Sequence, residues 1–413
     1  MSNSRLTKLF AAFFVIAGAL YSIALCGLQT MGAPITGASV AAADGLIVFS
    51  ALALSLWANP TEAMTPLLAI GINFLLIALF SQSIDLKSMR DCLVIAAFLP
   101  LGLSLGDLRT ARQAFFIVSA FVLAFGAFEY LFPALFVQFF NVLQFYLSRG
   151  AIDANQAQYV DTSLFVSGMR NGDRFLLPFL GPHRVSSIFL EPVSMGNFGA
   201  VSVAWGLALW RAHRRTALAA LLIGAVCIIF ADARFASFIT IAFLLAMLIP
   251  PNWTAYVLAP LPILAIALVL IMSVTVSLAG DDLPSRLATS GYALSNLSDG
   301  ALFGLSPGDR SSLDSGYTYV VTSFGLPFCV LLWVAYIALP AHGPTSQRFK
   351  LLFGLYICAL LCVSGSSLFA LKTAAIAWFL MGATIAEERA PSRTRSFVHA
   401  PHWRAARVQE SLP

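Results

Sequence analysis

Long apolar runs alternate with short polar segments along this chain, and the pattern predicts a bundle of membrane-spanning helices. A helix needs about 20 apolar residues to cross the hydrocarbon core of a bilayer. We assign twelve such runs, which cover residues 8–27, 39–58, 64–80, 91–106, 113–133, 188–210, 216–231, 234–250, 254–279, 317–339, 349–366 and 367–386. Segment 134–147 is aromatic and mildly amphipathic, and we expect it to lie along the interface or to extend the fifth helix.

The composition narrows the class further. Charged residues make up 10% of the 413-residue chain and hydrophobic residues 59%, whereas a soluble domain carries roughly 25% charged residues. The long runs also differ from the short alternating strands of an outer-membrane barrel. We therefore predict an all-α, polytopic transmembrane helical bundle of about 12 spans. The six cysteines lie in apolar runs and predict buried thiols, and the net charge of +5 requires no nucleic-acid partner.

The distribution of Lys and Arg predicts the orientation, because these residues collect in cytoplasmic loops. A cytoplasmic N-terminus places fourteen of the 24 basic residues inside, although Lys87 and Arg90 then fall outside. Both long polar loops, about 148–187 and 280–316, would be external. We thus expect one transmembrane domain over 1–386, a basic cytoplasmic tail over 387–413, and both termini of this inner-membrane protein in the cytoplasm.

Ionisable residues inside predicted spans suggest where a functional site lies, since their burial in lipid is costly. Five such residues, Asp44, Glu129, Glu191, Arg234 and Lys372, all fall in the outer half of the predicted membrane. Each by itself is explained by snorkelling at a helix end. Together they favour a site that faces the outer compartment. Transporters place their sites near the midplane, so the pattern favours an enzyme that acts on a lipid-anchored substrate at the outer surface.

The densest polar cluster, residues 181–198, lies where the first long loop enters the membrane. Pro192 suits the first turn of a helix and would place Glu191 near its N-cap. Arg184 and Glu191 are seven residues apart and would share one face if the stretch were helical. Either a functional pair or a simple ion pair that fixes the loop entry explains this arrangement.

Two further clusters contribute cationic and aromatic candidates. Residues 230–237 predict a tight outer turn from which Arg234 begins a helix; its guanidinium suits a phosphate, or it pairs with Asp232. Residues 308–327 contain Arg310, Asp314 and Tyr317 near the membrane surface. The chain has no Walker lysine motif and no HExxH motif, and its first external loop, 28–38, has no acidic residue. We therefore expect neither a catalytic metal nor a cofactor.

These motifs resemble the Wzy-type bacterial polysaccharide polymerases, within the O-antigen ligase and polymerase superfamily, and most closely the exopolysaccharide polymerases. The resemblance rests on Arg-x-x-Ser-x-Phe-x-Glu-Pro-x-x-x-Gly-Asn-Phe at 184–198, on the turn at 232–237, and on Asp-x-x-Tyr followed by Phe-Gly-Leu within 308–327. It implies oligosaccharide repeat units on undecaprenyl pyrophosphate as substrate. It also implies metal-independent polymerisation at the outer face of the inner membrane, with a flippase and a chain-length regulator as partners.

The resemblance also implies roles for particular residues. The family relies on arginines of the external loops, which here are Arg184 and Arg234, with Arg310 in support. Glu191, His183 and Asp314 are candidates for the general base, and burial favours Glu191 by making a carboxylate more basic. Tyr317 is a candidate for packing against a sugar ring, and Lys372 is a further substrate-binding candidate.

Two alternatives remain open at the level of the sequence. A ligase of the same superfamily would form a similar bond with a different acceptor. Related ligases tend to carry histidine two residues after the Asp of the late loop, where this chain has Gly316, which favours a polymerase. A polysaccharide-precursor transporter or flippase would instead move its substrate without forming a bond.

Overall fold

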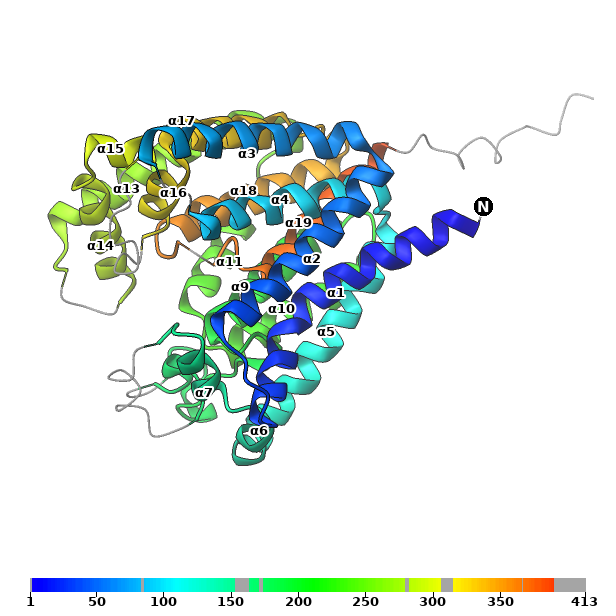
Figure 1. Ribbon diagram of the computed structural model, residues 1–413, viewed down its shortest axis with the longest axis vertical. Coiled ribbons are helices and arrows are strands. Elements are labelled where there is room, and N and C mark those ends of the chain that lie inside the picture. Colours follow the sequence, from blue (N-terminus) through cyan, green and yellow to red (C-terminus); the bar gives the residue numbers. More distant parts are fainter. Residues whose placement is uncertain are drawn as a thin grey trace, which may run out of the picture.

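The computed structural model describes residues 2–82, 85–152, 163–170, 174–278, 282–305, 315–365 and 367–389. The described chain is built from helices, and one isolated antiparallel bridge joins Met169 to His183 in the first long loop. The prediction of an all-helical membrane protein is therefore confirmed at this level. Figure 1 shows long inclined helices running from the end that holds the N-terminus to the end that holds α6 and α7.

The N-terminal half consists of five long helices followed by two short ones. These are α1 (Ser2–Thr30), α2 (Gly37–Ala58), α3 (Pro60–Ser81), α4 (Leu86–Leu105), α5 (Leu108–Leu131), α6 (Pro133–Phe139) and α7 (Val142–Ser148). The first five are long and apolar enough to cross a membrane. Segment 134–147 does not extend α5, because Pro133 begins the separate helix α6.

The C-terminal half is less regular. It contains the 3-10 helices η1 (Val166–Gly168), η2 (Pro178–Leu180), η3 (Ser187–Phe189) and η4 (Pro251–Trp253). Its α-helices are α9 (Pro192–Leu209), α10 (Arg214–Phe230), α11 (Arg234–Ala246), α12 (Thr254–Leu258), α13 (Leu261–Thr275), α14 (Leu283–Ser295), α15 (Asp299–Leu302), α16 (Gly316–Phe324), α17 (Leu326–Ala338), α18 (Pro344–Leu361) and α19 (Leu371–Arg389). The second long loop thus carries two helices of its own, α14 and α15.

Several predicted spans are not single straight helices. The predicted span 317–339 is wrong as one helix, because α16 and α17 meet at 108° around Gly325. Gly325 has φ +79, a conformation that glycine adopts at no steric cost. The predicted span 254–279 divides into α12 and α13, and α11 meets the η4–α12 segment at 113°. By length and composition, the described residues contain five clear spans, or seven if each bent pair counts as one.

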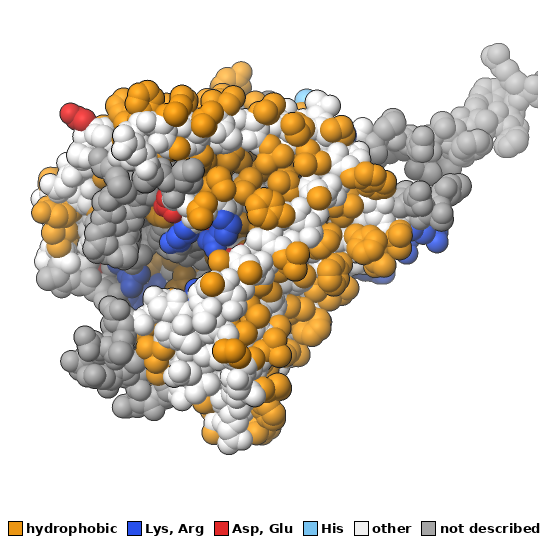
Figure 2. All heavy atoms as spheres, viewed as in Figure 1, with side chains coloured by type: hydrophobic (Ala, Val, Ile, Leu, Met, Phe, Trp, Pro, Cys, Tyr) orange, Lys and Arg blue, Asp and Glu red, His pale blue; other side chains and the backbone are white. Residues whose placement is uncertain are grey.

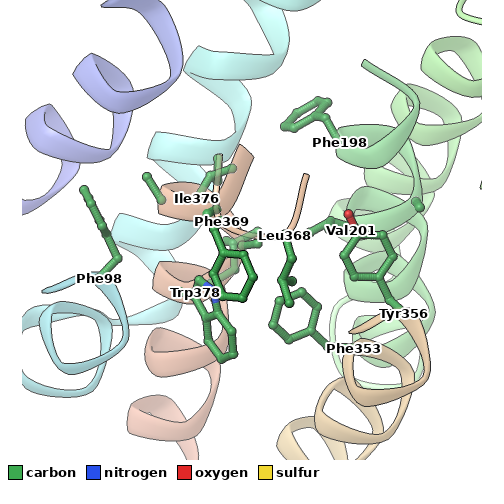
Figure 3. Close-up of a cluster of buried hydrophobic side chains, with 14 of the residues drawn as sticks. Phe98, Phe198, Val201, Phe353, Tyr356, Leu368, Phe369, Ile376 and Trp378 are labelled. Atoms are coloured by element: carbon green, nitrogen blue, oxygen red, sulfur yellow. The ribbon is translucent and has the colours of Figure 1, made fainter. Parts of the chain in front are cut away.

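An aromatic core joins the two halves of the bundle. Figure 3 shows Phe98 of α4 and Trp378 of α19 on one side, with Phe353 of α18 and Phe198 of α9 on the other. The rings of Phe353 and Trp378 meet edge-on with centroids 5.0 Å apart, the arrangement that aromatic quadrupoles prefer. α4 and α19 pack closely along their lengths, as do α9 and α10. This core packs α9, α18 and α19 against one another within their lengths.

Ion pairs and helix caps fasten the helix ends at the predicted cytoplasmic face. Lys8 pairs with Asp107 at 2.6 Å and Arg389 pairs with Glu62 at 2.8 Å. Glu387 accepts a hydrogen bond from the Leu108 backbone N–H at the start of α5. A carboxylate at a helix N-terminus stabilises unpaired N–H groups there, so the last turn of α19 caps a neighbouring helix.

Candidate functional site: an arginine-lined cavity

A cavity of about 460 Å³ lies where the first long loop meets α9, α11 and α14. Four guanidinium groups line it, those of Arg170, Arg184, Arg234 and Arg286. Figure 2 shows basic side chains, with an acidic one near them, gathered in a hollow of this face. A cavity of this size accommodates a small-molecule ligand, and the basic side chains among its described lining residues favour an anionic one.

The turn between α10 and α11 holds the loop arginines in place. Arg184 donates from Nε to the Ala231 carbonyl at 3.0 Å and from Nη1 to the Ser167 carbonyl at 2.9 Å. Arg174 donates to the carbonyls of His183, Ile229 and Phe230. These bonds orient the Arg184 side chain before any ligand arrives.

Asp232, in the turn between α10 and α11, binds two residues of the first long loop. Its carboxylate is fully buried, pairs with Arg170 at 2.9 Å, and accepts the Leu176 backbone N–H at 2.8 Å. Burial by itself would raise the pKa of Asp232, but the Leu176 N–H and the Arg170 guanidinium outweigh burial and hold this pKa below its usual range. The alternative pairing of Asp232 with Arg234 is not the one found.

Electrostatic strain is concentrated at Arg184. Burial lowers its pKa, repulsion from Arg170, Arg234 and Arg286 acts in the same direction, and Asp232 only partly opposes these effects. Cations that lie near one another repel, and an anion between them reduces that repulsion. The charges around Arg184 in the described part of the chain therefore favour an anionic ligand.

Arg234 and Arg286 reach the cavity from two different helices. Arg234 is the first residue of α11, which follows the tight turn as predicted, and its guanidinium lies 5.9 Å from the Phe175 ring centroid. Its buried Nε has no hydrogen-bond partner in the described part of the chain. Arg286 lies on α14, whose N-terminus is capped by Asp282. The helix of the second long loop thus completes a wall of the cavity.

Glu191 is the single acidic side chain among the described residues that line the cavity. It is the N-cap residue of α9 with Pro192 in the first turn, as predicted. Its carboxylate accepts hydrogen bonds from Tyr146 (2.5 Å) and Ser194 (2.9 Å) and lies 2.8 Å from Nζ of Lys372. The expectation that burial makes Glu191 basic is wrong, because these contacts stabilise the ionised carboxylate. Residues 184–191 also do not form one continuous helix, so Arg184 and Glu191 meet at the cavity by tertiary folding.

Glu129 and His183 support the loop from outside the cavity. The fully buried Glu129 carboxylate accepts the backbone N–H groups of Ser186 and Ser187. His183 Nε2 lies 3.2 Å from Glu129 Oε1 but lacks hydrogen-bond geometry. Glu129 therefore satisfies backbone groups that the 3-10 turn leaves unpaired, and it explains one of the five intramembrane charges.

Asp44 belongs to a separate network between α2, α4 and α16. Arg90 pairs with both Asp44 (2.7 Å) and Asp91, and Asp91 accepts a hydrogen bond from the Tyr319 hydroxyl. Lys87 lies over the Tyr319 ring at 5.4 Å. Arg90 and Lys87, the two exceptions to the predicted charge distribution, are thus engaged in contacts within the bundle.

The structure brings together only part of the predicted site. Arg184, Glu191 and Arg234 line the cavity, and Lys372 contacts it through Glu191. His183 does not line the cavity, and neither does Tyr317, whose hydroxyl donates to the Cys358 carbonyl between α16 and α18. The predicted residues 310 and 314, like most of the tail 387–413, lie outside the described residues.

Two of the four arginines, Arg170 and Arg286, were not among the residues predicted from the sequence. Arg170 lies in an irregular loop, and nothing in its local sequence distinguishes it from Arg174. Arg286 had a usable signal, because Asp282-Leu-Pro-Ser at 282–285 is a helix-start pattern that places an arginine in the second long loop on a helix.

The described residues offer no candidate metal site, and comparison with known proteins found no relative. In the described part of the chain, no group of three or more His, Cys, Asp or Glu side chains is arranged to hold a metal ion. All six cysteines are free; five are buried, and Cys329 is partly exposed. No protein-family model, curated protein or solved structure matches this chain.

Proposed function

We propose that this protein polymerises oligosaccharide repeat units carried on undecaprenyl pyrophosphate, at the outer face of the bacterial inner membrane. The observation that carries the proposal is the cavity with four guanidinium groups, in which the sole described carboxylate is already paired with a lysine. Two of the motifs that resemble those of the polysaccharide polymerases contribute to this cavity. The first supplies Arg184 and Glu191, and the second supplies Arg234.

The arginines suit the chemistry of such a donor. Polymerisation forms a bond between the acceptor hydroxyl oxygen and the anomeric carbon of the donor sugar, and it breaks the bond from that carbon to a pyrophosphate oxygen. The pyrophosphate leaves with the bonding electrons, and the hydroxyl proton is released to water. Cations fixed in advance around the leaving group stabilise the developing charge without reorganisation. One guanidinium group can donate two parallel hydrogen bonds to two phosphate oxygens. Arg170 and Arg184 are held by Asp232 and by backbone carbonyls, so they fit this role.

The acceptor sugar needs a partner for its attacking hydroxyl. Glu191 is the described carboxylate at the cavity, so we assign to it the hydrogen bond that orients this hydroxyl. Lys372, Tyr146 and Ser194 stabilise its negative charge and limit its strength as a base. We therefore expect Glu191 to contribute mainly by positioning, while the arginines contribute most of the rate.

Gly316 bears on the choice between polymerase and ligase. A Cβ atom added there would lie 2.5 Å from the Leu361 Cα atom and 2.5 Å from the Ser364 carbonyl oxygen. The packing of α16 against the end of α18 thus excludes the histidine that related ligases tend to carry at this position. If the resemblance to this superfamily holds for position 316, the exclusion of histidine there supports a polymerase over a ligase.

We expect Gly316→Ala to destabilise the protein by about 1–3 kcal/mol, as overpacking at a rigid contact does, and Gly316→His to destabilise it more. The measurement is the unfolding midpoint of each purified variant in detergent. Gly71→Ala serves as the matched control, because Gly71 lies within helix α3 and nothing lies within 4 Å of a Cβ atom added there. An alanine at 316 that leaves the midpoint unchanged would contradict the proposed steric exclusion.

The test of the function uses purified full-length protein in sealed proteoliposomes with undecaprenyl-pyrophosphate-linked repeat units. A polymerase yields a ladder of glycans and releases undecaprenyl pyrophosphate without added metal, flippase or chain-length regulator. Addition of a chain-length regulator should then narrow the ladder. A single transfer onto a different acceptor would indicate a ligase. Movement of the lipid-linked unit across the bilayer without any new bond would overturn the proposal in favour of a transporter.

A further inference from the structure

A second group of arginines lies at the opposite ends of α9 and α18 from the cavity. Arg211 follows α9, Arg214 and Arg215 begin α10, and Arg348 lies near the start of α18. The 18 residues of α9 separate this group from the cavity by about 27 Å at 1.5 Å per residue. This group takes no part in the proposed polymerisation.

Arg348 is buried, and no ion pair joins it to a carboxylate of the described residues. Its side chain is 8% exposed, Nη1 donates to the sulfur of Met247 at 3.7 Å, and Nε has no hydrogen-bond partner among the described residues. A thioether is a weak acceptor. The charged neighbour that acts on Arg348 is Arg211, and its effect is repulsive.

Lys350, two residues further along α18, is a buried cation whose hydrogen bonds are made within the protein. Lys350 is 5% exposed, and its ammonium donates to the carbonyl oxygens of Ile337 and Leu339 at the end of α17. Within the described ranges, the hydrogen bond of the Arg348 guanidinium is the weak one to the sulfur of Met247. Because a buried charge is costly unless it is paired or hydrogen-bonded, the contrast indicates that Arg348 is completed by an anion from outside the chain.

The surroundings indicate which anion. Trp210 and Trp253, 42% and 57% exposed, lie at the end of α9 and just before α12. Exposed tryptophan at the ends of membrane helices is typical of the membrane–water interface. Met247, the residue that Arg348 contacts, lies between the exposed apolar side chains of Leu245 and Leu248. A cation at the interface beside an apolar helix surface fits a phosphate that carries acyl chains.

We propose that Arg348 and Arg211 bind the headgroup phosphate of an anionic phospholipid, with its acyl chains against α11. The guanidinium of Arg348 holds the phosphate oxygens, and Arg211, Arg214 and Arg215 supply the surrounding positive charge. The site serves to anchor the end of the bundle that is distant from the cavity. A soluble phosphate ion lacks the acyl chains and gains only the electrostatic part of this binding.

The first experiment compares lipids on the wild-type protein. Full-length protein is reconstituted into nanodiscs of phosphatidylcholine alone or with phosphatidylglycerol, and the bound lipid is measured by native mass spectrometry together with the unfolding midpoint. We expect phosphatidylglycerol to be retained about tenfold more than phosphatidylcholine and to raise the midpoint. Equal retention of the two lipids would overturn the proposal. An equal effect of inorganic phosphate or glycerol phosphate in lipid-free detergent would also overturn it, in favour of a soluble anion site.

The second experiment uses Arg348→Met, which removes the charge and keeps much of the side-chain volume. In phosphatidylcholine, Arg348→Met should be at least as stable as the wild type, because an unpaired buried charge is gone. With phosphatidylglycerol, it should lose about tenfold of the lipid preference and most of the stabilisation. Arg109→Met, at an exposed residue near the start of α5, is the matched control and should behave like the wild type. Loss of preference in both variants, or in neither, would contradict a role for Arg348. If a variant does not fold, the comparison of the two lipids on the wild-type protein still tests the proposal.

Discussion

Replacement of Arg234 by alanine is expected to lower polymer formation by about two orders of magnitude and to leave the unfolding midpoint nearly unchanged. Removal of one preorganised donor to a developing negative charge typically costs 10²–10³ in rate. Arg234 is the cleanest of the four cavity arginines to remove, because its Nε bonds to nothing in the described structure and its neighbour Asp232 pairs with Arg170 instead. The measurement is the initial rate of glycan ladder formation in proteoliposomes.

Arg184→Ala is the comparison that separates an effect on the reaction rate from an effect on stability. Arg184 also bonds to the carbonyls of Ala231 and Ser167, so its removal should reduce both the rate and the unfolding midpoint. Arg174→Ala, which alters the same loop without touching the cavity lining, should reduce mainly the midpoint. Wild-type polymer from both Arg184→Ala and Arg234→Ala would rule out the cavity as the site of reaction.

Loss of the lysine beneath the cavity is expected to have the largest effect on stability. Lys372→Met leaves the Glu191 carboxylate, which is 25% exposed at the cavity, with only Tyr146 and Ser194. Removal of one partner of a fully buried ion pair costs about 3–5 kcal/mol, and because Glu191 is partly exposed we expect a cost of about 2–3 kcal/mol here. We therefore expect a lower unfolding midpoint in detergent and loss of the contact from Lys372 Nζ to the Phe189 carbonyl that ties α19 to η3.

The double variant Glu191→Gln/Lys372→Met tests whether the loss arises from the unpaired charge. We expect the double variant to recover most of the stability, since no buried charge remains, although the bond to Phe189 is still missing. Its activity then reports on Glu191 itself. Residual polymerisation at a reduced rate is expected of a positioning residue, whereas complete loss in a stable protein would indicate an essential base. A single Lys372→Met variant as stable as the wild type would contradict the structural role of the pair.

Local patterns in the sequence were sufficient for some features of the site. The proline at 192 predicted the start of α9 and the position of Glu191 at its N-cap, and residues 230–237 predicted the tight turn before Arg234. Both are local because the residues that determine them are neighbours in the chain. The breaks at Gly325 and between α12 and α13 were missed, since hydropathy does not distinguish one long helix from two short ones.

The partners of the charged residues were beyond the reach of any local pattern. Asp232 pairs with a residue 62 positions away, and Lys372 bonds to a residue 183 positions away. Tyr317, which looked like a surface aromatic, is buried against the end of α18. The predicted convergence of five intramembrane charges therefore holds for Glu191, Arg234 and Lys372, while Glu129 and Asp44 satisfy other parts of the bundle.

The sequence by itself determined that this protein is a helical membrane protein whose scarce charges lie at helix ends, because 10% charged residues cannot cover a soluble surface and the apolar runs are continuous along the chain. Tertiary structure decided which of those charges meet. The cavity arises where Arg170, Arg184, Arg234 and Arg286 approach from a loop and two separate helices. Packing between elements distant in the chain sets that approach and brings the four guanidinium groups to one cavity.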